Sequence, residues 1–427
     1  MDRRHIARWA LSLALLPVSL VMGQEKLQEK DTVAICGDSI TEQRLYSVFM
    51  EDYLLMCQPA QMMRTVQVGW SGETSWGFLG RMKQDALWFK PTVATTCYGM
   101  NDGAYTTYRE DIGKHYRQAM TDVVKTLKEG GVRFVVVGSP GMVDPAYFPP
   151  AYIGKRFADL PAAEYAKVYD ESLDKLRGIA QEVAKEQGVA YADVYGAMQD
   201  VMGKAKAKYG EKYSIGGSDG IHPASNGHIV MAYAFLKALG CDGNIGTITV
   251  DMKSGTAEGT EGHKVLSDTD GAVEVESSRY PFCFFGDPKE MTSTSGIIEF
   301  VPFNEDLNRF ELVVKNGPEK VKVTWGKETK EFTREQVEKG VNLAAEFLDN
   351  PFCEQFKKVE EAIKKQQLYE TAVTKTVFHL GPGSVGGGAA GFEALKEGVL
   401  HQDEEMAGRA SGLVVPVKYV IKVEGVQ

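Results

Sequence analysis

A serine follows an apolar run near the N-terminus, in the stretch VAICGDSITEQ at residues 33–43. The apolar run is typical of a strand buried on both faces, and Gly37 and Asp38 are residue types that favour turns. This pattern places Ser39 at the end of a strand, where its hydroxyl is available as a nucleophile; an ordinary turn explains the pattern equally well. A serine hydroxyl is a poor nucleophile until a base removes its proton, so catalysis also requires a histidine.

Among the seven histidines, His222 has the surroundings that suit a catalytic base. It lies in the glycine-rich segment GGSDGIHPASNGH, with Asp219 three residues before it. The glycines predict a loop in which Asp219 folds back onto the imidazole. An aspartate bonded to one ring nitrogen fixes the tautomer and leaves the other nitrogen as the base. His228 is interpreted as a polar residue of the following helix, without a catalytic role.

Acyl transfer also needs hydrogen-bond donors where negative charge develops on the substrate oxygen. The stretch VGWSGETSWG (68–77) places Gly72 in a turn, where its backbone N–H can approach a ligand. The stretch CYGMNDGAY (97–105) supplies Asn101, whose side-chain amide can donate. Turn chemistry alone explains each stretch taken singly. Taken together, the four polar clusters supply a nucleophile, a backbone donor, an amide donor and an Asp–His pair.

Four further residues are candidates for weak contacts with a substrate. Trp70 and Trp76 flank Gly72, and Met100 and Tyr105 flank Asn101. Aromatic side chains beside a site can stack on sugar rings or on an acyl chain, but core packing is an equally good interpretation of either tryptophan.

The elements that must position these residues alternate between strands and helices up to about residue 240. Short apolar runs rich in β-branched residues predict strands of a parallel sheet, and amphipathic stretches such as 163–188 predict helices between them. The fold class is therefore α/β, with functional residues at the carboxyl ends of strands. The strand-like runs are TVAIC (32–36), PTVATTCY (91–98), VRFVVVGS (132–139) and VAYADVY (189–195).

After Gly240 the pattern changes, and the chain is divided into four parts. Residues 1–23 are a signal, 24–242 the α/β domain, 243–333 a β-rich, sandwich-like domain, and 334–427 a helical segment with a closing strand. Period-2 runs predict the strands of the third part. These runs are GTITVDM, GAVEVES, SGIIEFV, RFELVVK and KVKVTWG. The stretch GPGSVGGGAAG (381–391) is predicted to be a flexible loop or linker.

The N-terminus has the features of an export signal. Three arginines precede an apolar stretch from Trp9 to Met22, and the small Gly23 follows. The stretch is shorter than the ~20 apolar residues that span a bilayer. An uncut membrane-anchoring helix is the alternative. We expect an exported protein with no membrane span once the signal is removed.

Composition and motifs argue against certain classes of ligand. The 427 residues carry a formal net charge of -10, which argues against a nucleic-acid-binding surface, since such a surface needs clustered lysine and arginine. No metal and no other cofactor is expected, because the sequence contains no HExxH motif, Cys/His cluster or acidic calcium loop.

The four clusters together resemble the SGNH, or GDSL-like, hydrolase family. The resemblance covers residues ~31–240 and rests on GDSIT, SGET, GMND and DGIHP in the family's order; Ile40 stands where the family name has leucine. It implies a flavodoxin-like three-layer fold and ester hydrolysis through an acyl-enzyme. It also implies a triad of Ser39, Asp219 and His222, and an oxyanion hole formed by the Ser39 N–H, Gly72 and Asn101.

The function expected from the sequence is an exported serine esterase that removes acetyl or similar small acyl groups from carbohydrates. One alternative is a lipolytic or thioester hydrolase. Another is a carbohydrate- or surface-binding protein that acts through its β-rich domain on an inactive core. The complete set of Ser39, Asp219 and His222 argues against the second alternative, because an inactive core need not keep all three.

Overall fold

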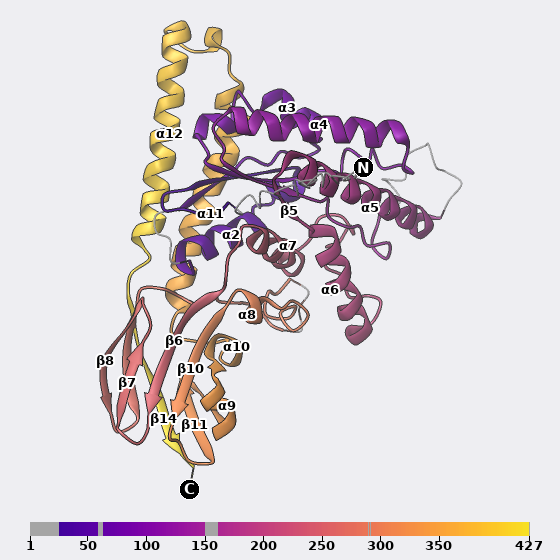
Figure 1. The fold of residues 1–427 in the computed structure, drawn as a ribbon. Helices are drawn as coiled ribbons and strands as arrows, with labels where there is room; N and C mark the ends of the chain where they lie inside the picture. The colour runs from indigo at the N-terminus through magenta and orange to yellow at the C-terminus, as the bar shows by residue number, and fades with distance from the viewer. Residues whose placement is uncertain (1–24, 59–62, 150–160, 289, 291, 427) are drawn as a thin grey trace, which may run out of the picture.

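Five parallel strands form the sheet on which the candidate site lies (Figure 1). The computed structural model describes residues 25–58, 63–149, 161–288, 290 and 292–426, so the predicted signal at 1–23 lies outside the described residues. The spatial order is β2-β1-β3-β4-β5, which is the flavodoxin-like order, and the predicted fold class is confirmed. The strands are β1 (Thr32–Gly37), β2 (Arg64–Gln67), β3 (Val93–Cys97), β4 (Phe134–Gly138) and β5 (Ala190–Ala192).

Helices cover both faces of this sheet, which explains why its strands are apolar throughout. Side chains alternate between the two faces of a strand. On β1, Val33 and Ile35 enter one hydrophobic core, whereas Ala34 and Cys36 enter the other. The first core is closed by α2 (Tyr46–Met56), α6 (Val194–Tyr209) and α7 (Ser225–Ala238), and the second by α3 (Ser75–Arg81), α4 (Glu110–Glu129) and the C-terminal half of α5 (Ala162–Gln187).

The β-rich part consists of a four-stranded sheet, in the order β13-β10-β6-β7, and a five-stranded sheet, in the order β12-β11-β14-β9-β8. Phe310 of the first sheet contacts Trp325 and Tyr419 of the second, with ring centroids 5.7 and 6.4 Å away, so the two sheets pack face to face. The strands are β6 (Asn244–Asp251), β7 (Thr256–Gly259), β8 (His263–Thr269), β9 (Ala272–Ser277), β10 (Arg309–Lys315), β11 (Lys320–Trp325), β12 (Glu328–Thr333), β13 (Val341–Asn342) and β14 (Val417–Gly425).

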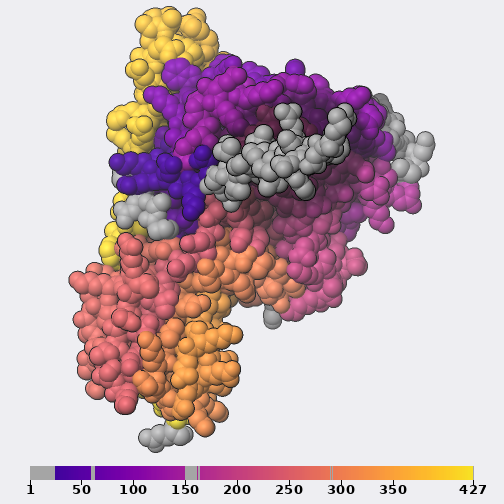
Figure 2. Space-filling view, in the orientation of Figure 1, coloured from indigo at the N-terminus to yellow at the C-terminus, as the bar shows by residue number. Residues whose placement is uncertain are grey.

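The C-terminal chain connects the two parts of the molecule. Short helices α8 (Phe303–Asp306), α9 (Arg334–Lys339) and α10 (Leu343–Glu346) precede α11 (Cys353–Lys375), which packs on α2 and β2 of the α/β part. Helix α12 (Gly388–Gly412) runs along the same side, as Figures 1 and 2 show, and leads down to β14 in the middle of the five-stranded sheet. No helix within the described ranges is long and apolar enough to cross a bilayer.

Two local predictions are wrong. The run SGIIEFV (295–301) forms turns rather than a strand, because its backbone groups bond locally: the Gly296 N–H donates to the Ser293 hydroxyl at 3.2 Å, and the Phe300 N–H donates to the Ile297 carbonyl at 3.0 Å. The glycine-rich stretch 381–391 is only partly a loop, since it contains a short 3-10 turn at Pro382–Ser384 and α12 begins at Gly388.

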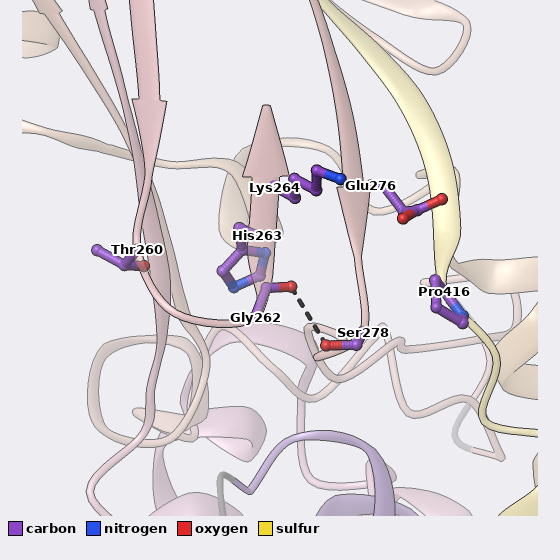
Figure 3. A pocket seen from close by; sticks show the side chains of 7 residues that line it. All are labelled: Thr260, Gly262, His263, Lys264, Glu276, Ser278 and Pro416. Atoms are coloured by element: carbon purple, nitrogen blue, oxygen red, sulfur yellow. Dashed lines mark hydrogen bonds between the residues drawn. The ribbon is translucent and has the colours of Figure 1, made fainter. Parts of the chain in front are cut away.

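A hollow in the β-rich part lies where β8, β9 and the start of β14 meet (Figure 3). His263 lines it, but both of its ring nitrogens are already bonded, to the Ser277 hydroxyl at 2.7 Å and to the Ile245 carbonyl at 2.9 Å. The ring also stacks on Phe310, at 4.8 Å between centroids. His263 therefore serves the packing of this part of the molecule.

Candidate active site

Ser39 stands at the carboxyl end of β1 and begins the short helix α1 (Ser39–Glu42). Asp38 caps this helix, because its Oδ1 accepts from the Ile40 N–H at 3.0 Å, as the sequence predicts for a residue that holds the turn. A Cβ at position 37 would lie 2.0 Å from the Thr41 hydroxyl and 2.9 Å from the Cys97 carbonyl. Gly37 is therefore required by the close approach of β1, α1 and β3.

The structure brings Ser39, His222 and Asp219 together in one chain of hydrogen bonds. The Ser39 Oγ lies 2.8 Å from Nε2 of His222, and Nδ1 of His222 lies 2.7 Å from Oδ2 of Asp219. The other oxygen of Asp219 accepts from the backbone N–H groups of His222, at 2.8 Å, and of Ile221, at 3.0 Å. Asp219 thus orients both the ring and the backbone of His222, and Nε2 is left to take a proton from Ser39.

The surroundings of Asp219 and His222 shift their pKa values in the directions that a carboxylate–imidazole pair requires. Partial burial raises the pKa of Asp219, but hydrogen bonds from the His222 ring and from the two backbone N–H groups outweigh it and lower the pKa to about 2. The hydrogen bond with Asp219 raises the pKa of His222 above its ordinary value, against the opposing effect of burial. Asp219 is therefore ionised at neutral pH, and the base it supports is stronger than an isolated imidazole.

Gly72 lies in an exposed turn near the end of β1. The turn closes with the Glu73 N–H on the Trp70 carbonyl at 3.1 Å, and Gly72 in its third position has a φ of +76°, as in a type II turn. The Trp70 N–H donates to the Gly37 carbonyl at 3.0 Å, which fastens the turn to the end of β1. The Gly72 N–H takes part in no hydrogen bond recorded among the described residues, and it is available to a ligand.

Asn101 approaches the same turn from β3. Its Nδ2 donates to the Glu73 carbonyl at 3.0 Å, which uses one of its two amide hydrogens and leaves the second. Next to it, Asp102 accepts from the N–H and hydroxyl of Ser75, at 3.0 and 2.5 Å, and so anchors the start of α3. The turn of Gly72 is thus held between the end of β1 on one side and Asn101 on the other.

The four weak candidates for substrate contact have different surroundings. Trp76 is 49% exposed and lies against His115, with ring centroids 4.9 Å apart. Trp70 is half-buried, and Tyr105 stacks on Tyr169 at 4.8 Å. Met100 is only 1% exposed and belongs to the hydrophobic core. Trp76 is thus the member of the four that offers the largest free aromatic surface.

The sequence did not predict that Gln43 joins the backbone of Ser39 to the segment that follows His222. The Tyr46 N–H donates to Nδ1 of His228 at 3.2 Å, so the hydrogen of His228 is on Nε2, which faces the Gln43 Oε1 at 3.2 Å. Burial lowers the pKa of His228 to about 3, which keeps this ring neutral. Gln43 in turn donates through Nε2 to the Pro223 carbonyl at 3.2 Å and through its backbone to the Ser39 carbonyl at 3.1 Å. Gln43 ends the quoted motif, but only the tertiary fold reveals its partner.

No cluster of three or more histidine, cysteine, aspartate or glutamate side chains suited to a metal ion occurs within the part of the chain that the structure describes. All six cysteines are free thiols, and five of them are buried.

We expect Asp219→Asn to lower kcat/KM on the order of 10³-fold, because the ring of His222 loses the partner that fixes its tautomer. The same change should move the acidic limb of the pH profile. With neutral His222 as the expected base, activity should rise as pH rises through the pKa of His222, and Asp219 raises that pKa. Without the carboxylate, the midpoint should shift to lower pH. A profile of kcat/KM against pH for both proteins checks this, and an unchanged midpoint would contradict it.

Comparisons with known proteins give a family match and similar solved structures. The model of the GDSL-like Lipase/Acylhydrolase family matches residues 35–229, a segment that contains Ser39, Gly72, Asn101, Asp219 and His222. Among solved structures, a gut microbial diltiazem-metabolizing enzyme is similar over 94% of this chain and 99% of its own, with a TM-score of 0.70 and 19% identity. Axe2, an acetylxylan esterase from Geobacillus stearothermophilus, is similar over 51% of this chain and 97% of its own, with a TM-score of 0.40 and 19% identity. The comparison with curated proteins found no match.

The likeness to the first of these structures concerns the fold alone, and it extends over the β-rich part and the C-terminal helices as well as the parallel sheet. The family match is confined to the parallel sheet and its helices, where all the candidate site residues lie. Residues 35–229 belong to the GDSL-like Lipase/Acylhydrolase family, and the chain is an ester-hydrolysing enzyme.

Proposed function

We propose that this enzyme hydrolyses carboxylic esters with Ser39 as nucleophile, His222 as general base and acid, and Asp219 as the residue that orients His222. The observation that carries the proposal is the chain of hydrogen bonds from Ser39 Oγ to His222 Nε2 and from His222 Nδ1 to Asp219. Nucleophile and base lie within hydrogen-bond reach, and a third group orients the base, which is the arrangement that activates a serine.

The reaction proceeds in two halves. Nε2 of His222 takes the proton of Ser39 as Oγ attacks the ester carbonyl, and Asp219 stabilises the imidazolium that forms. The imidazolium gives this proton to the departing alkoxide, which leaves the acyl group on Ser39. Water then attacks the acyl-enzyme as His222 takes one of its protons; the imidazolium gives this proton back to Ser39 Oγ as the bond to the acyl group breaks, and the carboxylic acid is released. The N–H groups of Ser39 and Gly72 and the free amide hydrogen of Asn101 bind the oxyanion in both halves.

For the substrate, we propose a small acyl ester of a carbohydrate, acted on outside the cytoplasm. The sequence of residues 1–23 supports export, and the exposed ring of Trp76, on the helix that follows the Gly72 turn, is suited to stacking on a sugar. The acidic surface and the appended β-rich part are consistent with an extracellular polymer as substrate.

A substrate panel tests this proposal. Rates should be compared for 4-nitrophenyl acetate, butyrate and palmitate, for acetylated xylan and for an acetyl thioester, each with wild type and with Ser39→Ala. Acetate and acetylated xylan should be the best substrates. A preference for palmitate would favour a lipolytic enzyme, and a preference for the thioester would favour a thioesterase. Acetyl release that does not depend on Ser39 would overturn the proposed site. The mass of the protein secreted by a bacterial host should lack residues 1–23.

A further inference from the structure

We propose that Lys375, at the end of α11, is a positioning residue for the oxyanion-binding turn of Gly72 and acts on it through Glu42. This inference rests on the proposed function, because it assigns a task in that reaction to a residue outside the hydrogen-bonded chain of Ser39, His222 and Asp219. It makes the C-terminal chain, which lies outside the segment matched by the family, a working part of the active site.

The turn needs an external support. Gly72 is exposed, and a Cβ built on it would have no neighbour within 4 Å among the residues that the structure describes, so none of these residues holds it in place by packing. Its φ of +76° lies in the region that glycine enters readily but also leaves readily. The direction of the Gly72 N–H is therefore set by the hydrogen bonds on either side of it rather than by steric confinement.

Glu42 supplies one such hydrogen bond to the turn. Its Oε2 accepts from the Ser71 N–H at 2.5 Å, and Ser71 is the residue directly before Gly72. On the other side, the Glu73 N–H is bonded to the Trp70 carbonyl. The peptide that carries the Gly72 N–H thus lies between two fixed backbone groups, one of which depends on a side chain of α1.

Lys375 holds that side chain. Its ammonium donates to Oε1 of Glu42 at 2.5 Å, so a single carboxylate bridges the last residue of α11 and the turn. The side chains of Lys375 and Glu42 are only 28% and 19% exposed, so water screens this pair less than it screens an ion pair on the open surface. Burial raises the pKa of Glu42, but the bonds from Lys375 and Ser71 outweigh it and keep the pKa below its usual value, so the bridging group is the carboxylate.

Helix α11 is itself fastened to the strand that leads into the turn. Glu370 accepts from the Gln67 N–H at 2.7 Å, and the Thr371 hydroxyl donates to the Gln67 side-chain oxygen at 3.1 Å. The Lys375 ammonium also lies 5.3 Å from the centre of the Trp70 ring, and His379 meets the same ring edge-on at 5.0 Å. The end of α11 therefore contacts the turn both through Glu42 and directly through Trp70.

Lys375→Met tests the proposal in the full-length enzyme, because methionine keeps the apolar stem against Trp70 and removes the charge. We expect kcat/KM for 4-nitrophenyl acetate to fall about 10- to 100-fold, mainly through kcat, since a misdirected donor weakens transition-state binding more than substrate binding. The inhibition constant of butylboronic acid, whose tetrahedral serine adduct imitates the transition state, should rise by a similar factor. Lys375→Arg, which keeps the charge, should restore most of the activity.

A matched control and a second variant keep the result interpretable. Lys330→Met breaks another intramolecular ion pair, with Glu346 at 3.1 Å in the β-rich part, and should leave both constants unchanged. Glu42→Gln should lower kcat/KM as Lys375→Met does, and the double variant should be no worse than the poorer single variant, because both changes break one support. If the two residues acted independently, the double variant would instead lose activity by the product of the two separate losses.

Values of kcat and of the inhibition constant within twofold of wild type in Lys375→Met would overturn the inference, as would equal effects of Lys375→Met and Lys330→Met. If Lys375→Met does not fold, Glu42→Gln decides on the same two constants. The activity of Ser39→Ala separates this test from that of the proposed function. An inactive Ser39→Ala together with an unaffected Lys375→Met would refute only the positioning role of Lys375. An active Ser39→Ala would refute the proposed active site itself.

Discussion

Ser39→Ala is expected to lower kcat/KM for a short-chain ester on the order of 10⁵-fold or more, because it removes the atom that forms the acyl-enzyme. Within the described part of the chain the hydroxyl is hydrogen-bonded to Nε2 of His222, and removal of this single oxygen opens no large cavity. The midpoint of thermal unfolding should therefore stay within a few degrees of wild type. Steady-state kinetics and circular dichroism on the same preparations check both statements.

The double variant Ser39→Ala, His222→Ala sharpens this prediction. When two residues carry out one catalytic step together, removal of either one abolishes that step. The double variant should therefore be about as slow as either single variant. A double variant slower than the poorer single variant by the product of the separate losses would mean that the two residues act in different steps. That result would contradict the assignment of His222 as the base of Ser39.

Ile421→Lys is expected to lower the free energy of unfolding by about 4 kcal/mol or more, since it places an unpaired charge in a core and removes a buried apolar side chain. Ile421 is fully buried in β14, between Trp325 of β11 and Val273 of β9. The prediction depends on β14 lying in the middle of its sheet, although it is the last strand of the chain. Urea unfolding of the full-length protein measures the change.

Val420→Lys is the matched control for this change. Val420 is the preceding residue on the same strand, is 49% exposed and lies opposite Glu274 of β9. A lysine there remains in water beside an opposite charge, so the expected change is within about 0.5 kcal/mol. Similar losses from both substitutions would contradict the register of β14, because adjacent residues of a strand face opposite sides.

The sequence predicts well those features whose cause is local. The strands β1, β3, β4 and β5 follow from short apolar runs, because both faces of a parallel sheet are buried. The proximity of Asp219 to His222 follows from a spacing of three residues in a glycine-rich loop. The arrival of Ser39 and Gly72 at the same edge follows from the topology of a parallel sheet, in which the carboxyl ends of the strands meet.

Features that depend on distant contacts were not predictable in this way. Lys375 meets Glu42 although 332 residues lie between them, and nothing in the sequence around either residue signals the other. The same holds for His228 and Gln43. The alternation in SGIIEFV resembles a strand, but a strand also needs a partner, and the backbone of this run bonds locally instead, as in the Gly296 N–H on the Ser293 hydroxyl and the Phe300 N–H on the Ile297 carbonyl.

The start of helix α12 is a helical segment that the local sequence did not predict. Glycines at its start weaken the intrinsic helical preference of residues 388–391, and the stretch resembles a linker. The helix forms because Asp403, on its buried face, accepts from Arg64 of β2 at 2.5 Å, and because Phe392 and Val399 are buried. Tertiary contacts thus override local propensity, and they place α12 beside the sheet.

Covalent labelling tests the central claim most directly. After brief incubation with diisopropyl fluorophosphate, which phosphorylates an activated serine much faster than other side chains, intact-mass and peptide-mapping spectrometry should find one adduct, on Ser39. Its formation should slow markedly in His222→Ala and be absent in Ser39→Ala. An adduct on another residue, or an unmodified Ser39 in an enzyme that the reagent has inactivated, would contradict the account.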